Sequence, residues 1–242
     1  MKHPIATAKK VLCNRIAAGK MRGALGAPDR SRICMFHDVV PEGAPLPDEY
    51  ACSINTLRRI VTAYQERGFS FVTLDALLDT PYRAAMRHMA VLTFDDGFSS
   101  VYTLAAPYLT EANVPFSVYV TTGYLGKEGY LSRSQLKSLA ASPLCTIGSH
   151  LVTHPMTRFL STEELKRELL ESRLTLERLT GKPVTHLAFP YGSAYACSLR
   201  DVRLAKKSGY RSAALTVPTA YDRLRPYPDH ALPRLNMPAQ FM

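Results

Sequence analysis

Near the middle of the chain, residues 90–97 read Ala-Val-Leu-Thr-Phe-Asp-Asp-Gly. The run from Ala90 to Phe94 is short, apolar and β-rich, which predicts a strand buried inside a parallel sheet. It leads directly into Asp95 and Asp96, and Gly97 allows a tight turn after them. Because adjacent residues leaving a strand diverge, one carboxylate could bind a metal ion while the other acts on a nearby water as a general base. Asp-Asp-Gly is also a common turn sequence, so a purely structural role stays open.

Similar runs recur on both sides of this segment, in alternation with helical patterns. The clearest helix is Ser161–Leu179, which opens with a Ser-Thr-Glu-Glu capping box and stops at Gly181, and Ser53–Arg67 is similar. The other predicted strands are Ile33–Phe36, Phe71–Leu74, Phe116–Val120, Leu144–Ile147, Thr185–Phe189, Ser212–Thr216 and Ala231–Leu235. This alternation without a linker favours one α/β domain whose parallel sheet closes into a β/α barrel. Reactive groups then belong at the carboxyl ends of the strands.

The composition excludes several classes of protein. The 242 residues are 46% hydrophobic and 21% charged, which is typical of a globular chain and excludes disordered and fibrous proteins. No run approaches the roughly 20 apolar residues of a transmembrane helix, so an integral membrane protein is excluded. The five cysteines are scattered and form no C-x-x-C pair, so we expect them to be reduced. The N-terminal segment lacks the apolar core of a signal peptide, which predicts a cytoplasmic location.

The N-terminal segment, residues 1–30, holds seven basic residues and one acidic residue of a chain whose net charge is +10. Ile5, Ala8, Leu12 and Ile16 recur there at roughly helical spacing. The segment could form an amphipathic helix on an anionic membrane face, or remain a solvated basic tail. No nucleic-acid-binding motif accompanies the charge, so no nucleic-acid partner is expected. We expect the folded domain to occupy residues 31–242.

Two histidines, His150 and His154, follow the predicted strand that ends at Ile147. In a single helical turn their spacing would place both imidazoles on one face, as a divalent metal ion requires of two nitrogen ligands. Pro155 disfavours a longer helix, so we expect a short turn. With one carboxylate, the pair would leave an open coordination position for water. Ordinary surface or core roles remain the alternative for both histidines.

Two further elements follow predicted strands. The turn Phe189-Pro190-Tyr191-Gly192 must be irregular because of its Pro and Gly, and an exposed backbone N–H in such a turn can stabilise an oxyanion. His37 follows the first strand, where a group that titrates near neutral pH could act as an acid. A lone histidine after a strand is more often structural, so both interpretations of His37 stay open.

In order and setting, these elements resemble the polysaccharide deacetylase family, the carbohydrate esterases built on the NodB homology domain. The resemblance covers roughly His37 to Met237 and assigns residues 31–242 to such a domain. Thr93–Gly97 is similar to the first motif of the family, and Phe189–Gly192 is similar to the third. His150–His154 is similar to the second motif, although Leu151 stands where Ser or Thr is usual.

Three features depart from the family pattern. Ala188 stands where the third motif usually opens with an arginine that contacts the catalytic aspartate, and the chain has no tryptophan for the fourth motif. No late Leu-x-His is recognisable, since His230 lies in a different context. In the branch that resembles poly-N-acetylglucosamine deacetylases, an early aromatic-His-Asp segment supplies the acid, and the segment around His37 is similar to it.

The resemblance implies a distorted β/α barrel and a metal-dependent hydrolase that removes N-acetyl groups from an amino sugar in a saccharide or polysaccharide precursor. The implied roles are Asp95 as general base, His37 as general acid, Asp96, His150 and His154 as ligands of one divalent ion, and the Tyr191 backbone N–H beside Pro190 as the oxyanion site. Zinc suits these donors best, with cobalt, nickel or iron as alternatives.

Two other functions fit the same residues. The fold could hydrolyse another small amide or ureide, or the chain could be a catalytically impaired carbohydrate-binding homologue. Because the predicted location is cytoplasmic, a lipid-linked or nucleotide-linked N-acetylated saccharide is the favoured substrate.

Overall fold

The structure, a computed structural model, describes residues 30–80, 88–221 and 229–237. The predicted amphipathic helix near the N-terminus therefore lies outside the described residues. Two sheets are present in the described parts: an eight-stranded sheet in which all paired strands are parallel, and a two-stranded sheet. Among the helices within these ranges, none is long and apolar enough to cross a bilayer.

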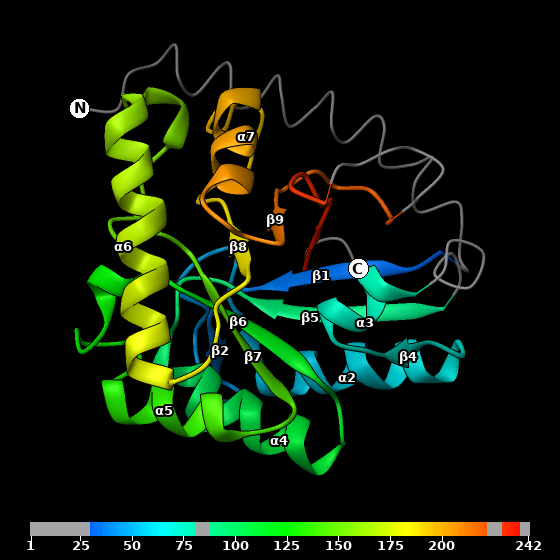
Figure 1. The fold of residues 1–242 in the computed structure, drawn as a ribbon. Coiled ribbons are helices and arrows are strands. Elements are labelled where there is room, and N and C mark those ends of the chain that lie inside the picture. Colours follow the sequence, from blue (N-terminus) through cyan, green and yellow to red (C-terminus); the bar gives the residue numbers. More distant parts are fainter. Residues whose placement is uncertain (1–29, 81–87, 222–228, 238–242) are drawn as a thin grey trace.

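The elements follow one another in a β/α alternation (Figure 1). The strands are β1 Arg32–Phe36, β2 Val39–Val40, β3 Cys52–Ser53, β4 Ser70–Phe71, β5 Met89–Phe94, β6 Phe116–Val120, β7 Cys145–Ser149, β8 His186–Ala188, β9 Ser212–Ala214 and β10 Leu235–Asn236. The α-helices are α2 Ile54–Glu66, α3 Leu74–Asp79, α4 Ala106–Glu111, α5 Arg133–Ala141, α6 Thr162–Thr180 and α7 Leu199–Lys207. Short helical turns at Val101–Ala105, Thr122–Tyr124 and Thr157–Phe159 complete the set.

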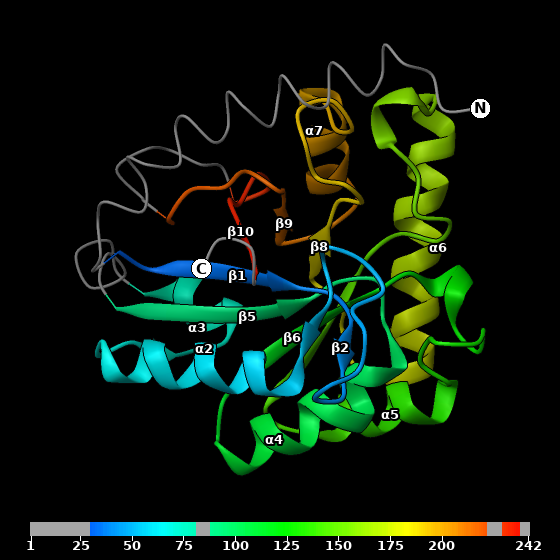
Figure 2. The same ribbon diagram turned by 180° about the vertical axis from the view of Figure 1, so that it is seen from behind.

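The large sheet closes into a distorted barrel, as predicted. Its strand order is β10-β1-β5-β6-β7-β8-β9, with β4 beside β5. Figure 2 shows β10 next to β1. At the other edge, Ala214 of β9 forms a parallel bridge with Leu232, which lies just before β10 in the chain. The segment from Leu232 to β10 therefore contacts both edges of the sheet and joins them.

Successive side chains of each strand point to opposite faces of the sheet, so the buried apolar residues form two clusters, one on each face. In β5, Ala90, Leu92 and Phe94 belong to the larger cluster, which packs against α2, α4, α5 and α6 around the outside of the barrel (Figure 1). Val91 points to the opposite face and packs with residues of α3. Because side chains alternate along a strand, Asp95 points to the same inner face of the barrel as Val91. By the same alternation, His37 after β1 and His150 after β7 point to the inner face of the barrel.

The two predicted helices form nearly as expected. In α6, Ser161 and Glu164 make the reciprocal capping box, and Gly181 ends the helix in the left-handed region with φ 69°. The helix α2 begins at Ile54 with Ser53 as its N-cap. These local signals predicted the helix ends correctly because the capping groups lie within the helix segments themselves.

Two predicted strands were wrong in most of their extent. Two others differ by two residues at their ends: β7 continues to Ser149 and β9 ends at Ala214. The run Phe71–Leu74 stays a strand only to Phe71, because the Thr73 hydroxyl accepts a hydrogen bond from the Ala76 N–H and starts α3 at Leu74. In the run Ala231–Leu235, Pro233 lacks an N–H to pair, so the run gives a bridge at Leu232 and the two-residue strand β10. The small sheet of β2 and β3 was not predicted.

The described cysteines form no disulfide, as the sequence predicted, and they are buried; they are Cys34, Cys52, Cys145 and Cys197. Burial raises the pKa of Cys145 and the pKa of Cys197 to about 12. These thiols therefore stay protonated near neutral pH and are poor nucleophiles.

Candidate active site

The carboxyl ends of the strands bring the predicted site residues to one end of the barrel. Strands β1 and β5 pair in register, and the Asp95 N–H donates a hydrogen bond to the Phe36 carbonyl at 2.9 Å. His37 therefore leaves β1 at the level of Asp95. The His150 N–H donates to the Val120 carbonyl at the end of β6, also at 2.9 Å. The register of neighbouring strands thus sets all three residues at the same height.

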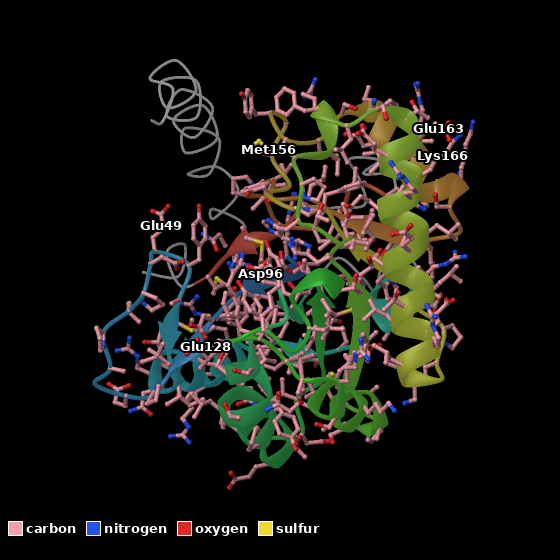
Figure 3. The ribbon with its side chains drawn as sticks, turned by 90° about the vertical axis from the view of Figure 1, so that its left-hand side faces the viewer. Glu49, Asp96, Glu128, Met156, Glu163 and Lys166 are labelled. Atoms are coloured by element: carbon pink, nitrogen blue, oxygen red, sulfur yellow. The ribbon has the colours of Figure 1, made fainter. Side chains whose placement is uncertain are left out.

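Asp96, His150 and His154 converge on one point. Each offers one ligand atom, and these atoms lie within 4.8 Å of one another. Asp96 Oδ1 lies 3.4 Å from His150 Nε2 and 3.2 Å from His154 Nε2, yet this buried oxygen makes no hydrogen bond of acceptable geometry with any described residue. Figure 3 shows Asp96 near the centre of the face at the carboxyl ends of the strands.

The hydrogen bonds of His150 fit a cation at this point. Its Nδ1 lies 2.7 Å from the Ala188 carbonyl, which can only accept, so Nδ1 carries the proton and Nε2 presents a lone pair in the neutral ring. That lone pair faces Asp96 Oδ1, and two acceptors at this distance repel unless a cation lies between them. Burial lowers the pKa of His150, but Asp95 and Asp96 raise it more, so its pKa is raised overall.

The loop that carries the histidines is not the helical turn predicted from their spacing. Leu151 and His154 have φ angles of 65° and 59°, in the left-handed region, which no right-handed turn contains. The loop is held in place by the Glu168 carboxylate of α6, which accepts hydrogen bonds from the Val152 and Thr153 N–H groups at 2.7 and 3.0 Å. Convergence of the imidazoles therefore depends on a contact with α6 that residue spacing does not reveal.

Asp95 is buried and forms a bidentate ion pair with Arg234, a residue the sequence analysis missed. Guanidinium nitrogens Nη1 and Nη2 donate to Asp95 Oδ1 and Oδ2 at 2.6 and 2.7 Å. Burial raises the pKa of Asp95, but the charge of Arg234, with smaller effects from His150 and His37, lowers it more. Asp95 is therefore ionised near neutral pH.

Arg234 makes the contact that the usual arginine of the third motif would make from the position of Ala188. It comes from the segment that closes the barrel, just before β10, and its side chain is fully buried. A signal was present in the sequence: an arginine within the predicted buried strand Ala231–Leu235 is a buried charge, and a buried charge needs a partner of opposite sign.

His37 lies at the start of the loop that follows β1, beside Tyr50. Its ring centroid is 5.2 Å from that of Tyr50, and its Nδ1 is buried without a hydrogen bond to any described residue. The Ser100 hydroxyl ties this loop to the one after β5, because it donates to Asp38 at 2.6 Å and accepts from the Val39 N–H at 3.1 Å. Burial lowers the pKa of His37 more than Asp95 and Asp96 raise it.

The turn after β8 is irregular, as predicted. Tyr191 and Gly192 have φ angles of 60° and 52°, and a Cβ on Gly192 would collide with Thr216. The Gly192 N–H donates back to the Pro190 carbonyl at 2.7 Å. Within the part of the chain that the structure describes, the Tyr191 N–H has no backbone partner, and the Tyr191 ring lies 4.7 Å from that of His154. This N–H is therefore free to donate a hydrogen bond to a ligand oxygen.

His230, the late histidine, does not join the cluster. Its Nε2 bonds to the Tyr210 carbonyl at 2.7 Å. Tyr210 precedes β9, so this contact lies at the amino end of the strand, away from the carboxyl ends where the other residues gather.

A chain of aromatic rings that the sequence analysis did not single out begins beside His154. The ring centroid of Tyr124 lies 6.2 Å from that of His154 and 4.7 Å from that of Tyr130, which stacks on Phe98 at 5.0 Å. In a chain without tryptophan, tyrosines thus form the wall beside the candidate metal ligands.

Comparison with known proteins identifies the family. The family model for polysaccharide deacetylases matches residues 83–213, more than half of the chain. The chain belongs to the polysaccharide deacetylase family. A polysaccharide deacetylase from Bacillus cereus has a similar structure, with a TM-score of 0.74 and 22% identity over 88% of this chain and 67% of that one. IcaB from Ammonifex degensii is similar too, with a TM-score of 0.73 and 22% identity over 87% of this chain and 92% of that one.

Curated members of the polysaccharide deacetylase family are similar over part of their length. YxkH of Bacillus subtilis is 24% identical over a segment that covers 61% of this chain and 52% of YxkH. YheN of the same organism is 29% identical over a segment that covers 49% of this chain and 41% of YheN. The chain therefore spans about half or less of the length of these relatives.

Proposed function

We propose that this member of the polysaccharide deacetylase family is a metal-dependent hydrolase that removes N-acetyl groups from an amino sugar in a saccharide or polysaccharide precursor. The observation that carries the proposal is the convergence of Asp96, His150 and His154 beside an ionised Asp95. A carboxylate for the base, three ligand atoms for an ion and a free backbone N–H for an oxyanion are the parts that amide hydrolysis requires.

Asp96, His150 and His154 would hold the divalent ion. Their donor atoms, one oxygen and two nitrogens, suit zinc best, and cobalt, nickel or iron can use the same set. When bound, such an ion supplies a Lewis acid that polarises the amide carbonyl and lowers the pKa of a water molecule.

The chain's own residues would carry the proton transfers. Asp95, held ionised and oriented by Arg234, takes a proton from the attacking water. The Tyr191 N–H, exposed by the turn that Pro190 and Gly192 impose, donates to the oxyanion. His37 in its protonated form donates to the departing amine, and burial makes this imidazolium a stronger acid because it lowers the pKa of His37.

We propose a lipid-linked or nucleotide-linked N-acetylated saccharide as the substrate, met in the cytoplasm. This substrate follows from the predicted location of the chain, which cell fractionation with an antibody against the protein would test.

His37→Ala should slow the hydrolysis of substrates with a poor leaving group much more than that of substrates with a good one. The wild-type protein should release acetate from N-acetylglucosamine oligosaccharides and from an activated aryl acetate. An amine needs a proton in order to depart, whereas an activated phenolate does not. His37→Ala should therefore lower kcat on the oligosaccharide by about 10²–10⁴ and change turnover of the aryl ester by much less. Acetate release measured on both substrates tests this.

The matched control is His230→Gln, which changes a histidine outside the site. If it lowers oligosaccharide turnover selectively while His37→Ala does not, the acid is misassigned. No acetate release from any amino sugar, with turnover of a cyclic ureide instead, would reject the proposed substrate class.

In the pH profile of kcat/KM, Arg234→Met should move the acid limb to higher pH. The change removes the positive charge that lowers the pKa of Asp95 and leaves the burial that raises it, so protonation would inactivate the base at a higher pH than in the wild type. Arg234→Lys keeps the charge and should show a smaller shift. An unpaired buried carboxylate should also destabilise the fold by about 3–5 kcal/mol, which thermal denaturation measures. An unmoved acid limb in a folded Arg234→Met protein would show that Arg234 does not tune the base.

A further inference from the structure

Four exposed apolar side chains lie on the two segments that follow the candidate site residues His154 and Tyr191. Met156, Phe159, Tyr195 and Leu199, here called the apolar rim, are 36%, 62%, 37% and 74% exposed. Met156 and Phe159 follow the metal-ligand candidate His154, while Tyr195 and Leu199 follow the turn after β8. The rings of Phe159 and Tyr195 contact each other at 5.5 Å, and Figure 3 shows Met156 on the same face as Asp96. Clustered exposed apolar residues mark an interaction surface more often than scattered ones do.

The apolar rim is built as one rigid unit from its two loops. The Arg158 guanidinium donates to the Ala194 carbonyl at 2.7 Å and to the Cys197 carbonyl at 3.1 Å. In return, the Arg200 guanidinium donates to the Leu160 and Thr157 carbonyls at 2.8 and 2.9 Å. These reciprocal bonds hold the four apolar side chains in position before any partner arrives, so binding would order few additional groups.

The surface next to the apolar rim is cationic. In α7, Leu199 shares one exposed helix face with Arg203, Lys206 and Lys207, at spacings of four, seven and eight residues. The acidic residue of this helix, Asp201, is fully buried and accepts hydrogen bonds from the Thr157 hydroxyl and the Ser198 N–H. The exposed face of α7 therefore carries an apolar side chain at one end and three positive charges behind it.

Two acidic residues at the start of α6, the helix that packs against α7, make local contacts. At the start of α6, Glu163 pairs with Lys166 at 2.8 Å, and Glu164 accepts a hydrogen bond from the Ser161 N–H at 2.7 Å. Glu49 and Glu128 lie apart from Met156 in Figure 3.

We infer that the apolar rim and the exposed face of α7 dock the protein on an anionic lipid bilayer. Phe159 and Leu199 would enter the boundary between headgroups and acyl chains, and Arg203, Lys206 and Lys207 would contact lipid phosphates. A glycan chain fits this surface less well. An N-acetylated sugar is neutral, and its deacetylated product is a cation that three basic residues would repel.

Docking in this orientation would place the active site at the bilayer surface. The Tyr191 ring, 52% exposed, lies beside His154, and the chain continues from it into the apolar rim. A lipid-anchored sugar could then reach the site without leaving the membrane. The docking itself does not depend on the proposed reaction and can be measured separately from it.

Vesicle cosedimentation of the full chain tests the inference. The probes are phosphatidylcholine vesicles with and without phosphatidylglycerol. Phe159→Ser with Leu199→Ser should weaken binding to the anionic vesicles by at least about tenfold, because two apolar side chains lose their burial. Arg203→Gln with Lys207→Gln should also weaken it about tenfold, with little change on neutral vesicles.

The matched control is Leu170→Ser with Leu174→Ser, which removes two apolar side chains of α6 that are 46% and 45% exposed. This protein should bind vesicles like the wild type, and all variants should keep wild-type turnover of a soluble aryl acetate. The inference is overturned if the wild type does not bind anionic vesicles, or if the Phe159/Leu199 variant binds them as tightly as the control does. It is also overturned if that variant keeps vesicle binding and raises KM for a soluble oligosaccharide, since the rim would then be a sugar subsite.

Discussion

Asp95→Asn is expected to keep the divalent ion and to lose kcat by about 10²–10⁴, the usual contribution of a general base. An amide cannot accept the proton of the attacking water at neutral pH. The ion should stay because the three converging ligand atoms belong to Asp96, His150 and His154, while the nearer oxygen of Asp95 is 4.0 Å from His150 Nε2. Elemental analysis and acetate release on the same preparation measure both quantities.

The matched control for this change is Asp75→Asn. Asp75 also pairs with an arginine, Arg211, and it lies 3.3 Å from a histidine, His186, but at the amino end of β8. The same loss of charge there should leave kcat unchanged. If Asp95→Asn loses the ion while Asp96→Asn retains it, the two aspartates exchange roles.

Local signals in the sequence were sufficient for the fold class and for most strands. Buried runs such as Phe116–Val120 became the strand predicted, because strands inside a parallel sheet are apolar on both faces. Errors arose where a side chain competes with the strand. The Thr73 hydroxyl starts a helix, and Pro233 interrupts the closing segment. Neither outcome follows from hydrophobic pattern alone.

In the candidate site, too, the sequence could predict the position of some residues and not of others. Residues that end strands, such as Asp95 and His150, could be placed because the carboxyl ends of parallel strands meet. Arg234 could not, because its contact with Asp95 joins two segments more than a hundred residues apart and requires closure of the barrel. The left-handed loop at His154 also depends on tertiary contacts. The sequence thus predicted which groups gather, and the structure was needed to identify what orients them.

His150→Ala and His154→Ala should both lose the ion and the activity together, with the larger effect at His150. His150 is 2% exposed, and its ring orientation is set by the Ala188 carbonyl, so no water can easily replace it. The His154 side chain is 17% exposed, and a water molecule could fill its place in part. Loss of a ligand should reduce metal affinity by more than the roughly 10- to 100-fold seen when only a hydrogen-bond partner of a ligand is lost.

Competition between metal and proton gives a second test of the same site. Asp95 and Asp96 raise the pKa of His150, so a proton should compete with the ion at a higher pH than for an ordinary histidine. Metal affinity measured by titration should therefore fall as pH decreases through that raised pKa. His37→Ala, which changes a nearby histidine outside the ligand set, should keep both the stoichiometric ion and this pH dependence. If His150→Ala and His154→Ala retain the ion and His37→Ala loses it, the ion is held by a different set of residues, with His37 among them.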